Sequence, residues 1–196
     1  TAFAALPARC IALRVGKLSD RLDRPIVLVG LMGAGKSTVG RRLPKRLNLP
    51  FIDSDSAIAD AAGCSAAEVF ERFGEEDFRD GERRLVARLI DGEIRVIATG
   101  GGAYVDPRTR QLLNERAITL WLDAPVDVLV DRTGRRDTRP LLKTDPRGTL
   151  ERLAKDRGPL YGEAHVRVTS GEGAHNDVVE AIIAAVEAHL DGNSKD

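Results

Sequence analysis

The chain has 196 residues, of which 42% are hydrophobic and 31% charged, a composition typical of one globular domain with a full-sized core. Its 30 basic and 30 acidic residues balance, so the sequence predicts neither a nucleic-acid partner nor a membrane partner. Two cysteines without a C-x-x-C spacing argue against a disulfide framework or a cysteine zinc site, and no apolar run approaches the ~18 residues of a membrane span. We therefore expect a cytoplasmic protein.

Residues 1–24 are expected to form a poorly ordered or partly helical amino-terminal extension. Pro7 and Gly16 interrupt any long helix there. The alternative is a transit peptide, because residues 1–17 carry basic side chains and no acid. We expect a single domain over residues 25–190 and a short tail over residues 191–196.

The sequence from residue 26 to residue 38 contains the strongest motif. An apolar run, Ile26–Val29, leads directly into G-x-x-x-x-G-K-S, the pattern of a phosphate-binding P-loop between a strand and a helix. Such a loop turns several backbone N–H groups towards a polyphosphate, which glycine allows. The alternative is a glycine-rich turn with a surface lysine. The predicted ATP-phosphate ligands are Gly33, Ala34, Gly35, Lys36, Ser37 and Thr38.

Beyond this motif, short apolar runs alternate with helical patterns, which predicts an α/β fold with a central parallel sheet flanked by helices. Pro44 is expected to kink or shorten the helix after the P-loop. Further helices are expected from residue 149 to about residue 157 and over residues 177–190. The expected strands are residues 26–29, 51–52, 96–98, 118–122 and 165–169.

Asp53 and Asp55 follow the second expected strand. Strand side chains alternate, so both carboxylates can face the P-loop edge, one towards Mg²⁺ and one towards a substrate hydroxyl. Alternatively, one of them caps the next helix. Asp123, after the fourth strand, is a rival for the magnesium acid, but Pro125 behind it favours a helix cap.

Two further segments leave alternatives open. Arg79 and Glu82 share a helical face, either as a solvated ion pair or with the glutamate holding the arginine for an anionic substrate. Three glycines, Gly100 to Gly102, follow the third strand, which indicates a close approach to the backbone, with a ligand as the natural candidate. Ser65 and Glu68 have the spacing of a capping box.

The segment of about residues 132–148 is basic and punctuated by glycine and proline. A run of charges is usually only solvated. In a neutral chain with a P-loop, it is better explained as a mobile lid that folds arginines over transferring phosphates.

Taken together, the motifs G-L-M-G-A-G-K-S-T, F-I-D-S-D, E-x-x-F-R-D-G-E, T-G-G-G, W-L-D-A-P, T-R-P-L-L and R-G-P-L-Y, in this order, resemble the shikimate kinase family. The resemblance covers about residues 25–190. It implies the three-layer P-loop NTPase fold of the nucleoside-monophosphate-kinase-like group, with five parallel strands. It also implies transfer of the γ-phosphoryl group of ATP to the 3-hydroxyl of shikimate, on the way to chorismate and the aromatic amino acids.

The resemblance also implies roles for individual residues. Asp55 matches the aspartate that binds the ring hydroxyls and accepts the proton, and Asp53 matches the one near magnesium, with Ser37 as a metal ligand. Lys36 and Arg139 join Asp55 as catalytic residues, Arg139 reaching the phosphates from the lid. Arg132 matches an arginine packed against adenine. The residues implied to bind shikimate are Asp55, Arg79, Gly100, Gly101, Gly102 and Arg157.

Two departures from the family pattern stand out: Pro44 in the first helix, and residues 169–174, which lack an arginine or glutamine near adenine. A second candidate is another small-metabolite kinase, acting on gluconate or a nucleoside monophosphate. A third is a nucleotide-binding regulator without catalysis. Arg79 with Arg157 favours a small carboxylate, and Lys36 with Asp55 favours an active enzyme. Nothing in the sequence demands more than a monomer.

Overall fold

The computed structural model describes residues 18–134, 145–171 and 175–193. Its centre is a five-stranded sheet in the order β2-β3-β1-β4-β5, in which every neighbouring pair is parallel. The predicted fold class is therefore confirmed. The strands are β1 (Ile26–Val29), β2 (Phe51–Asp53), β3 (Val96–Ala98), β4 (Ile118–Asp123) and β5 (Val166–Thr169).

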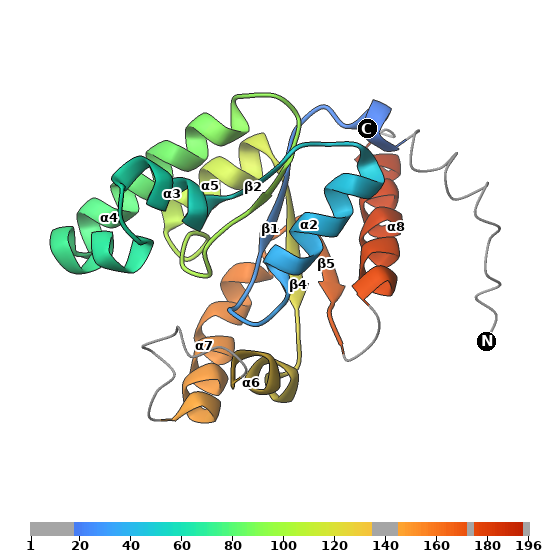
Figure 1. The fold of residues 1–196 in the computed structure, drawn as a ribbon. Helices are drawn as coiled ribbons and strands as arrows, with labels where there is room; N and C mark the ends of the chain where they lie inside the picture. The colour runs from blue at the N-terminus through green and yellow to red at the C-terminus, as the bar shows by residue number, and fades with distance from the viewer. Residues whose placement is uncertain (1–17, 135–144, 172–174, 194–196) are drawn as a thin grey trace.

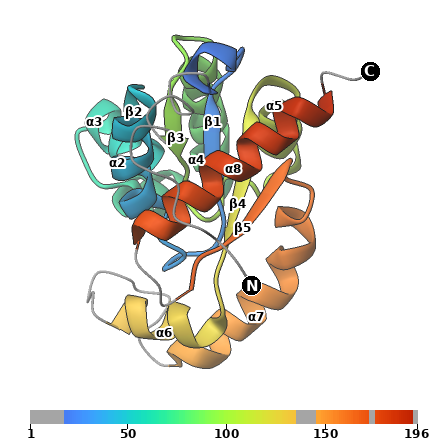
Figure 2. The same ribbon diagram turned by 90° about the vertical axis from the view of Figure 1, so that its right-hand side faces the viewer.

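Helices cover both faces of the sheet (Figures 1 and 2). They are α2 (Lys36–Leu47), α3 (Ser54–Ala62), α4 (Ala66–Ile90), α5 (Pro107–Arg116), α6 (Val126–Gly134), α7 (Pro146–Tyr161) and α8 (His175–Asn193). Helices α2 and α8 pack together on one face, and α4, α5 and α7 lie on the other. None of the helices in the described part of the chain has the length and apolar character of a membrane span.

The core forms because β1 is apolar on both faces and both faces are covered. All four residues of β1 are fully buried, as expected for the central strand of a parallel sheet. Val39, Leu43 and Leu47, spaced four residues apart, form a buried stripe along α2. Leu18 and Leu22, in and after a helical turn at residues 18–21, are also buried in this core. Packed structure therefore begins before the strand that leads into the P-loop.

Pro44 lies inside α2, is buried, and does not end the helix. The helix continues to Leu47 and stops at Asn48, which has a left-handed φ of 52°. The carbonyl of Pro44 accepts the N–H of Asn48 and, at 2.9 Å, that of Leu49. These two bonds close the helix within one turn of the proline.

Helices α4 and α7 each have a feature that the sequence patterns did not predict. Helix α4 begins with the predicted capping box of Ser65 and Glu68, but Gly74 interrupts it with φ 81° and ψ 176°. Helix α7 does not end near Arg157 and continues through Pro159 to Tyr161. A proline removes its own N–H bond and crowds the carbonyl four residues earlier, and here the helix ends two residues after it. Arg157 and Tyr161 are thus one turn apart on the same helix.

A polar network lies near the amino-terminal ends of β4 and β5. The Thr119 N–H donates to Nδ1 of His165 at 3.1 Å, and the His165 N–H donates to Thr119 Oγ1 at 3.1 Å. Asn114 Oδ1 accepts from Thr119 Oγ1 at 2.9 Å and from the Tyr104 hydroxyl at 2.7 Å. Burial lowers the pKa of His165, and the nearby His189 and Arg24 act in the same direction. The network therefore needs the neutral imidazole.

This network predicts a loss of stability in mild acid. Because the folded pKa of His165 lies below its unfolded value of about 6.5, its contribution to stability is complete above about pH 6.5 and is lost as the pH falls further. We expect His165→Gln to remove part of the fall in the urea midpoint between about pH 7.5 and pH 5. His189→Gln, which leaves the His165 imidazole in place, is the control and should keep most of that fall. An unchanged fall in the His165→Gln variant would contradict the prediction.

Candidate active site

The P-loop joins the end of β1 to the start of α2. Gly30, Gly33 and Gly35 have φ values of 133°, 84° and 101°, which side chains rarely adopt. A Cβ at Gly30 would also lie 2.5 Å from the carbonyl oxygen of Leu122 on β4, so packing requires glycine there as well. The loop therefore leads directly into the N-terminus of α2, where unpaired N–H groups and the helix dipole favour an anion.

Lys36, the first residue of α2, holds its ammonium group against this loop. Nζ donates to the carbonyl oxygens of Gly30 at 2.7 Å and Leu31 at 2.9 Å. The positive charge is thereby fixed beside the backbone N–H groups of the loop. A nucleotide phosphate in the loop would meet both.

Ser37 and Asp53 meet beside the P-loop. The Ser37 hydroxyl donates to Asp53 Oδ2 at 3.0 Å. Asp53 is also the N-cap of α3, with Oδ1 accepting the N–H of Asp55 at 3.1 Å. Both sequence-based alternatives for Asp53, a helix cap and an acid at the P-loop, therefore describe contacts that it makes. A hydroxyl and a carboxylate are the hard oxygen ligands that suit Mg²⁺.

Arg132, on α6, lies against the opposite side of the loop. Its Nη1 donates to Ser170 Oγ at 3.0 Å, and its Nη2 donates to the Gly171 carbonyl at 2.6 Å. Nη1 also lies 3.4 Å from the carbonyl oxygens of Gly33 and Ala34. Arg132 thus connects the P-loop to the end of β5. Arg139, the other arginine predicted to bind ATP, lies outside the described residues, as does most of the predicted lid.

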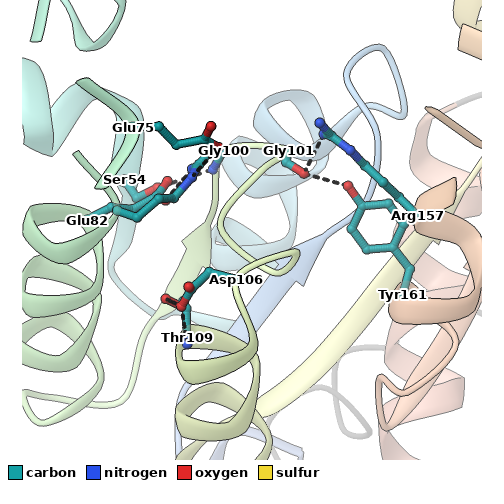
Figure 3. A network of polar contacts seen from close by, with 10 residues as sticks. Ser54, Glu75, Glu82, Gly100, Gly101, Asp106, Thr109, Arg157 and Tyr161 are labelled. Carbon is teal, nitrogen blue, oxygen red and sulfur yellow. Dashed lines mark hydrogen bonds and ion pairs between the residues drawn. The ribbon is translucent and has the colours of Figure 1, made fainter. Parts of the chain in front are cut away.

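The turn Gly100–Gly102 after β3 is the centre of a second cluster. A Cβ at Gly100 would lie 2.5 Å from Asp55 Oδ1, and a Cβ at Gly102 would lie 2.9 Å from Cζ of Arg79. The sequence predicted that some group approaches the backbone of these three glycines closely. In this structure the side chains of Asp55 and Arg79 do so. From the other side, Nη1 of Arg157 donates to the Gly101 carbonyl at 3.2 Å (Figure 3).

The two clusters are adjacent. A Cβ at Gly101 would lie 3.6 Å from both the carbonyl oxygen of Gly30 and the amide nitrogen of Met32 in the P-loop. The structure therefore brings the aspartate of α3, the arginine of α4 and the arginine of α7 together beside the phosphate loop. A small molecule at the glycine turn would therefore lie beside the P-loop.

Arg79 and Glu82 are not a solvated pair. The Glu82 side chain is 1% exposed, and Nη1 of Arg79 lies 2.5 Å from its Oε2. Burial raises the pKa of Glu82, and the Arg79 guanidinium opposes this shift. A buried carboxylate is stable in its ionised form only with such a partner. Glu82 therefore fixes one edge of the guanidinium while the group lies over Gly102.

Ser54 connects the start of α3, which carries Asp55, to the glycine turn. Its side chain is buried, and its Oγ accepts the N–H of Gly100 at 3.3 Å. Ser54 lies between Asp53 and Asp55, so this bond ties the turn that carries both carboxylates to the glycine turn. Sequence reasoning missed this contact, although Ser54 is the serine of the F-I-D-S-D motif.

Asp123 makes a contact that neither sequence-based alternative had considered. It is the last residue of β4, and its Oδ2 accepts from Nη2 of Arg167 at 2.6 Å. The same guanidinium lies over the ring of Trp121, with 4.4 Å from Cζ to the ring centroid.

Tyr161 was also missed. Its hydroxyl donates to the Gly101 carbonyl at 2.6 Å, the same oxygen that Arg157 contacts. The available signal was the spacing of four residues between Arg157 and Tyr161, which places two side chains on one helical face if the helix continues through Pro159.

Comparison with known proteins agrees with this geometry. Residues 32–187 match the family model described as shikimate kinase. The shikimate kinase of Rhodopseudomonas palustris is 52% identical over 169 residues, covering 86% of this chain and 83% of the relative. That of Caulobacter vibrioides is 52% identical over 168 residues, covering 85% and 84%. The solved shikimate kinase from Acinetobacter baumannii in complex with shikimate is similar in structure, with a TM-score of 0.79 and 39% identity over 84% of this chain and 93% of that one. The chain belongs to the shikimate kinase family.

Proposed function

We propose that this chain transfers the γ-phosphoryl group of ATP to the 3-hydroxyl of shikimate, giving shikimate 3-phosphate and ADP, on the way to chorismate and the aromatic amino acids. Its membership of the shikimate kinase family supports this activity. The observation that carries it in the structure is the convergence of Asp55, Arg79 and Arg157 on one glycine turn beside the P-loop.

The two arginines are proposed to bind the carboxylate of shikimate. A guanidinium presents parallel N–H donors that match the two oxygens of a carboxylate. Arg79 approaches the turn from α4 and Arg157 from α7, so a carboxylate between them would have donors on both sides. The backbone of Gly100, Gly101 and Gly102 lies within reach of the same molecule.

Asp55 is proposed to orient the attacking hydroxyl and to accept its proton. Its side chain is exposed and lies against Gly100, so it borders the substrate position. As the new O–P bond forms, the hydroxyl proton passes to this carboxylate and the bridging P–O bond of ATP breaks, releasing ADP. The transition state is loose and its charge is spread over the phosphoryl oxygens, so positioning and countercharge supply most of the rate.

The P-loop is proposed to bind ATP and supply much of that countercharge. The backbone from Gly33 to Thr38 would hold the phosphates, with Lys36 between the outer ones. Arg132, already against the loop, is proposed to lie beside the adenine. Arg139 is proposed to reach the transferring phosphoryl group from the lid.

Mg²⁺ is proposed to accompany ATP. The Ser37 hydroxyl and the Asp53 carboxylate, 3.0 Å apart and next to the loop, are the residues that would hold the ion and its water shell. When bound, the ion supplies positive charge to the phosphate oxygens. We also propose that the protein is a monomer and works in the cytoplasm.

The direct test is a coupled assay of ADP release with and without shikimate. We expect ADP to form rapidly with shikimate and slowly with gluconate or a nucleoside monophosphate. Rapid turnover of one of the latter two would identify a different small-molecule kinase. ATP binding without turnover of any of the three would favour a regulator that has lost catalysis.

A further inference from the structure

Tyr161 ends α7 and points its hydroxyl at the glycine turn (Figure 3). The side chain is 1% exposed, and its Oη donates to the Gly101 carbonyl at 2.6 Å. Burial raises the pKa of this hydroxyl, while Arg157, which also hydrogen-bonds it, acts in the opposite direction. The net shift is upward, so the hydroxyl stays protonated and remains a donor at neutral pH. The Gly101 carbonyl therefore has a second, uncharged partner besides Arg157.

The ring of Tyr161 is held by two other aromatic rings. The Tyr104 ring is stacked on it at 6.1 Å between centroids, and the Trp121 ring lies at 6.0 Å. The contact that Tyr104 makes with Tyr161 is through its ring and not through its hydroxyl. A buried ring packed against two other rings has little freedom, so its hydroxyl is held at a fixed position beside the carbonyl.

The bond fixes the peptide between Gly101 and Gly102. A trans peptide is planar, with its carbonyl and N–H pointing in opposite directions, and the described residues contain no cis peptide. A carbonyl held towards α7 therefore turns the Gly102 N–H away from α7. Gly102 is also the residue that the Arg79 guanidinium covers. This peptide therefore lies between Arg157, which contacts its carbonyl, and Arg79, which lies over Gly102.

Arg157 has two possible acceptors: the Gly101 carbonyl, to which it donates in this structure, and the carboxylate of a bound substrate. If it is to bind a substrate carboxylate with its fork, the Gly101 carbonyl needs another donor, because an unsatisfied backbone carbonyl is costly. The Tyr161 hydroxyl is such a donor. In this structure the carbonyl accepts from both Tyr161 Oη and Arg157 Nη1, so Arg157 can turn Nη1 towards a carboxylate without leaving the carbonyl unpaired. Without the tyrosine hydroxyl it could not.

We propose that Tyr161 is a positioning residue for the substrate carboxylate: its hydroxyl holds the Gly101–Gly102 peptide in place and leaves the Arg157 guanidinium available for shikimate. The inference rests on the proposed function, since it assumes that Arg157 binds that carboxylate. Helix α7 begins at Pro146, inside the predicted lid of about residues 132–148, so the same helix runs from the end of that segment to this peptide.

The test is Tyr161→Phe, which removes only the hydroxyl. We expect the KM for shikimate to rise about tenfold, as for the loss of one hydrogen bond to a buried partner, with kcat changed by less and the KM for ATP unchanged. Tyr104→Phe is the matched control, because it removes a hydroxyl from a buried tyrosine in the same stack, and its KM for shikimate should stay within twofold of the parent. Equal rises in the two variants, or a parallel rise in the KM for ATP, would overturn the proposal.

A second variant guards against a folding defect. Para-aminophenylalanine at residue 161 keeps the ring, nearly the same volume and a donor, and it should restore the parental KM for shikimate. A raised KM in this variant, with an unchanged melting temperature, would also overturn the proposal. If the parent itself does not turn over shikimate, the proposed function fails. If the parent is active and Tyr161→Phe matches it, only the role of Tyr161 fails.

Discussion

Replacing Asp55 with asparagine is expected to lower kcat for shikimate by about 10²- to 10⁴-fold, the usual contribution of a positioned acid or base. Asparagine keeps the shape of the side chain but cannot accept the proton of the attacking hydroxyl. The KM for ATP should change little, because the phosphate loop is built from other residues. Steady-state kinetics with both substrates measures kcat and the KM for ATP.

Asp60→Asn is the matched control for this experiment. Asp60 is exposed on the same helix, α3, and the site described above does not include it. Its variant should have parental kinetics. Near-normal turnover in Asp55→Asn would remove Asp55 from the role of proton acceptor.

Arg79→Lys is expected to raise the KM for shikimate by about 10- to 100-fold, since hydrogen bonds to charged groups contribute about 1.5 to 3 kcal/mol. An ammonium group can keep the ion pair with buried Glu82, but it cannot also present two parallel donors to a carboxylate. The effect should appear mainly in KM, because the interaction is made in the ground state as well as in the transition state.

Arg83→Lys provides the comparison. Arg83 lies on the same helix and pairs with Asp80 instead of Glu82. Its variant should leave the KM for shikimate within twofold of the parent. An equal KM in Arg79→Lys and the parent would show that Arg79 does not bind the substrate carboxylate.

Much of the framework could be predicted from the sequence because each part had a local signal. The apolar run of β1 before the glycine pattern predicted the strand, loop and helix around Lys36, and the parallel sheet followed from alternating strand and helix patterns. The residues of the glycine turn were also identified beforehand, together with Asp55 and Arg79. Their roles in binding and catalysis remain predictions.

The contacts that were missed depend on packing between distant segments. Spacing placed Arg79 and Glu82 on one face but gave no sign that Glu82 is buried, which is decided by the helices packed around it. The carbonyl contact of Tyr161 depends on α7 continuing through Pro159, a position at which local rules predict a break. Asp123 was assigned a cap from the proline that follows it, whereas its carboxylate pairs with Arg167 on the neighbouring strand.

The central claim is that Arg79 and Arg157 hold the carboxylate of shikimate so that its 3-hydroxyl lies at Asp55, beside the P-loop. The most direct measurement is a crystal structure of the chain with shikimate and ADP. We expect the carboxylate oxygens within about 3.2 Å of both guanidinium groups and the 3-hydroxyl within the same distance of Asp55. Shikimate bound elsewhere, or with its carboxylate away from both arginines, would contradict the account.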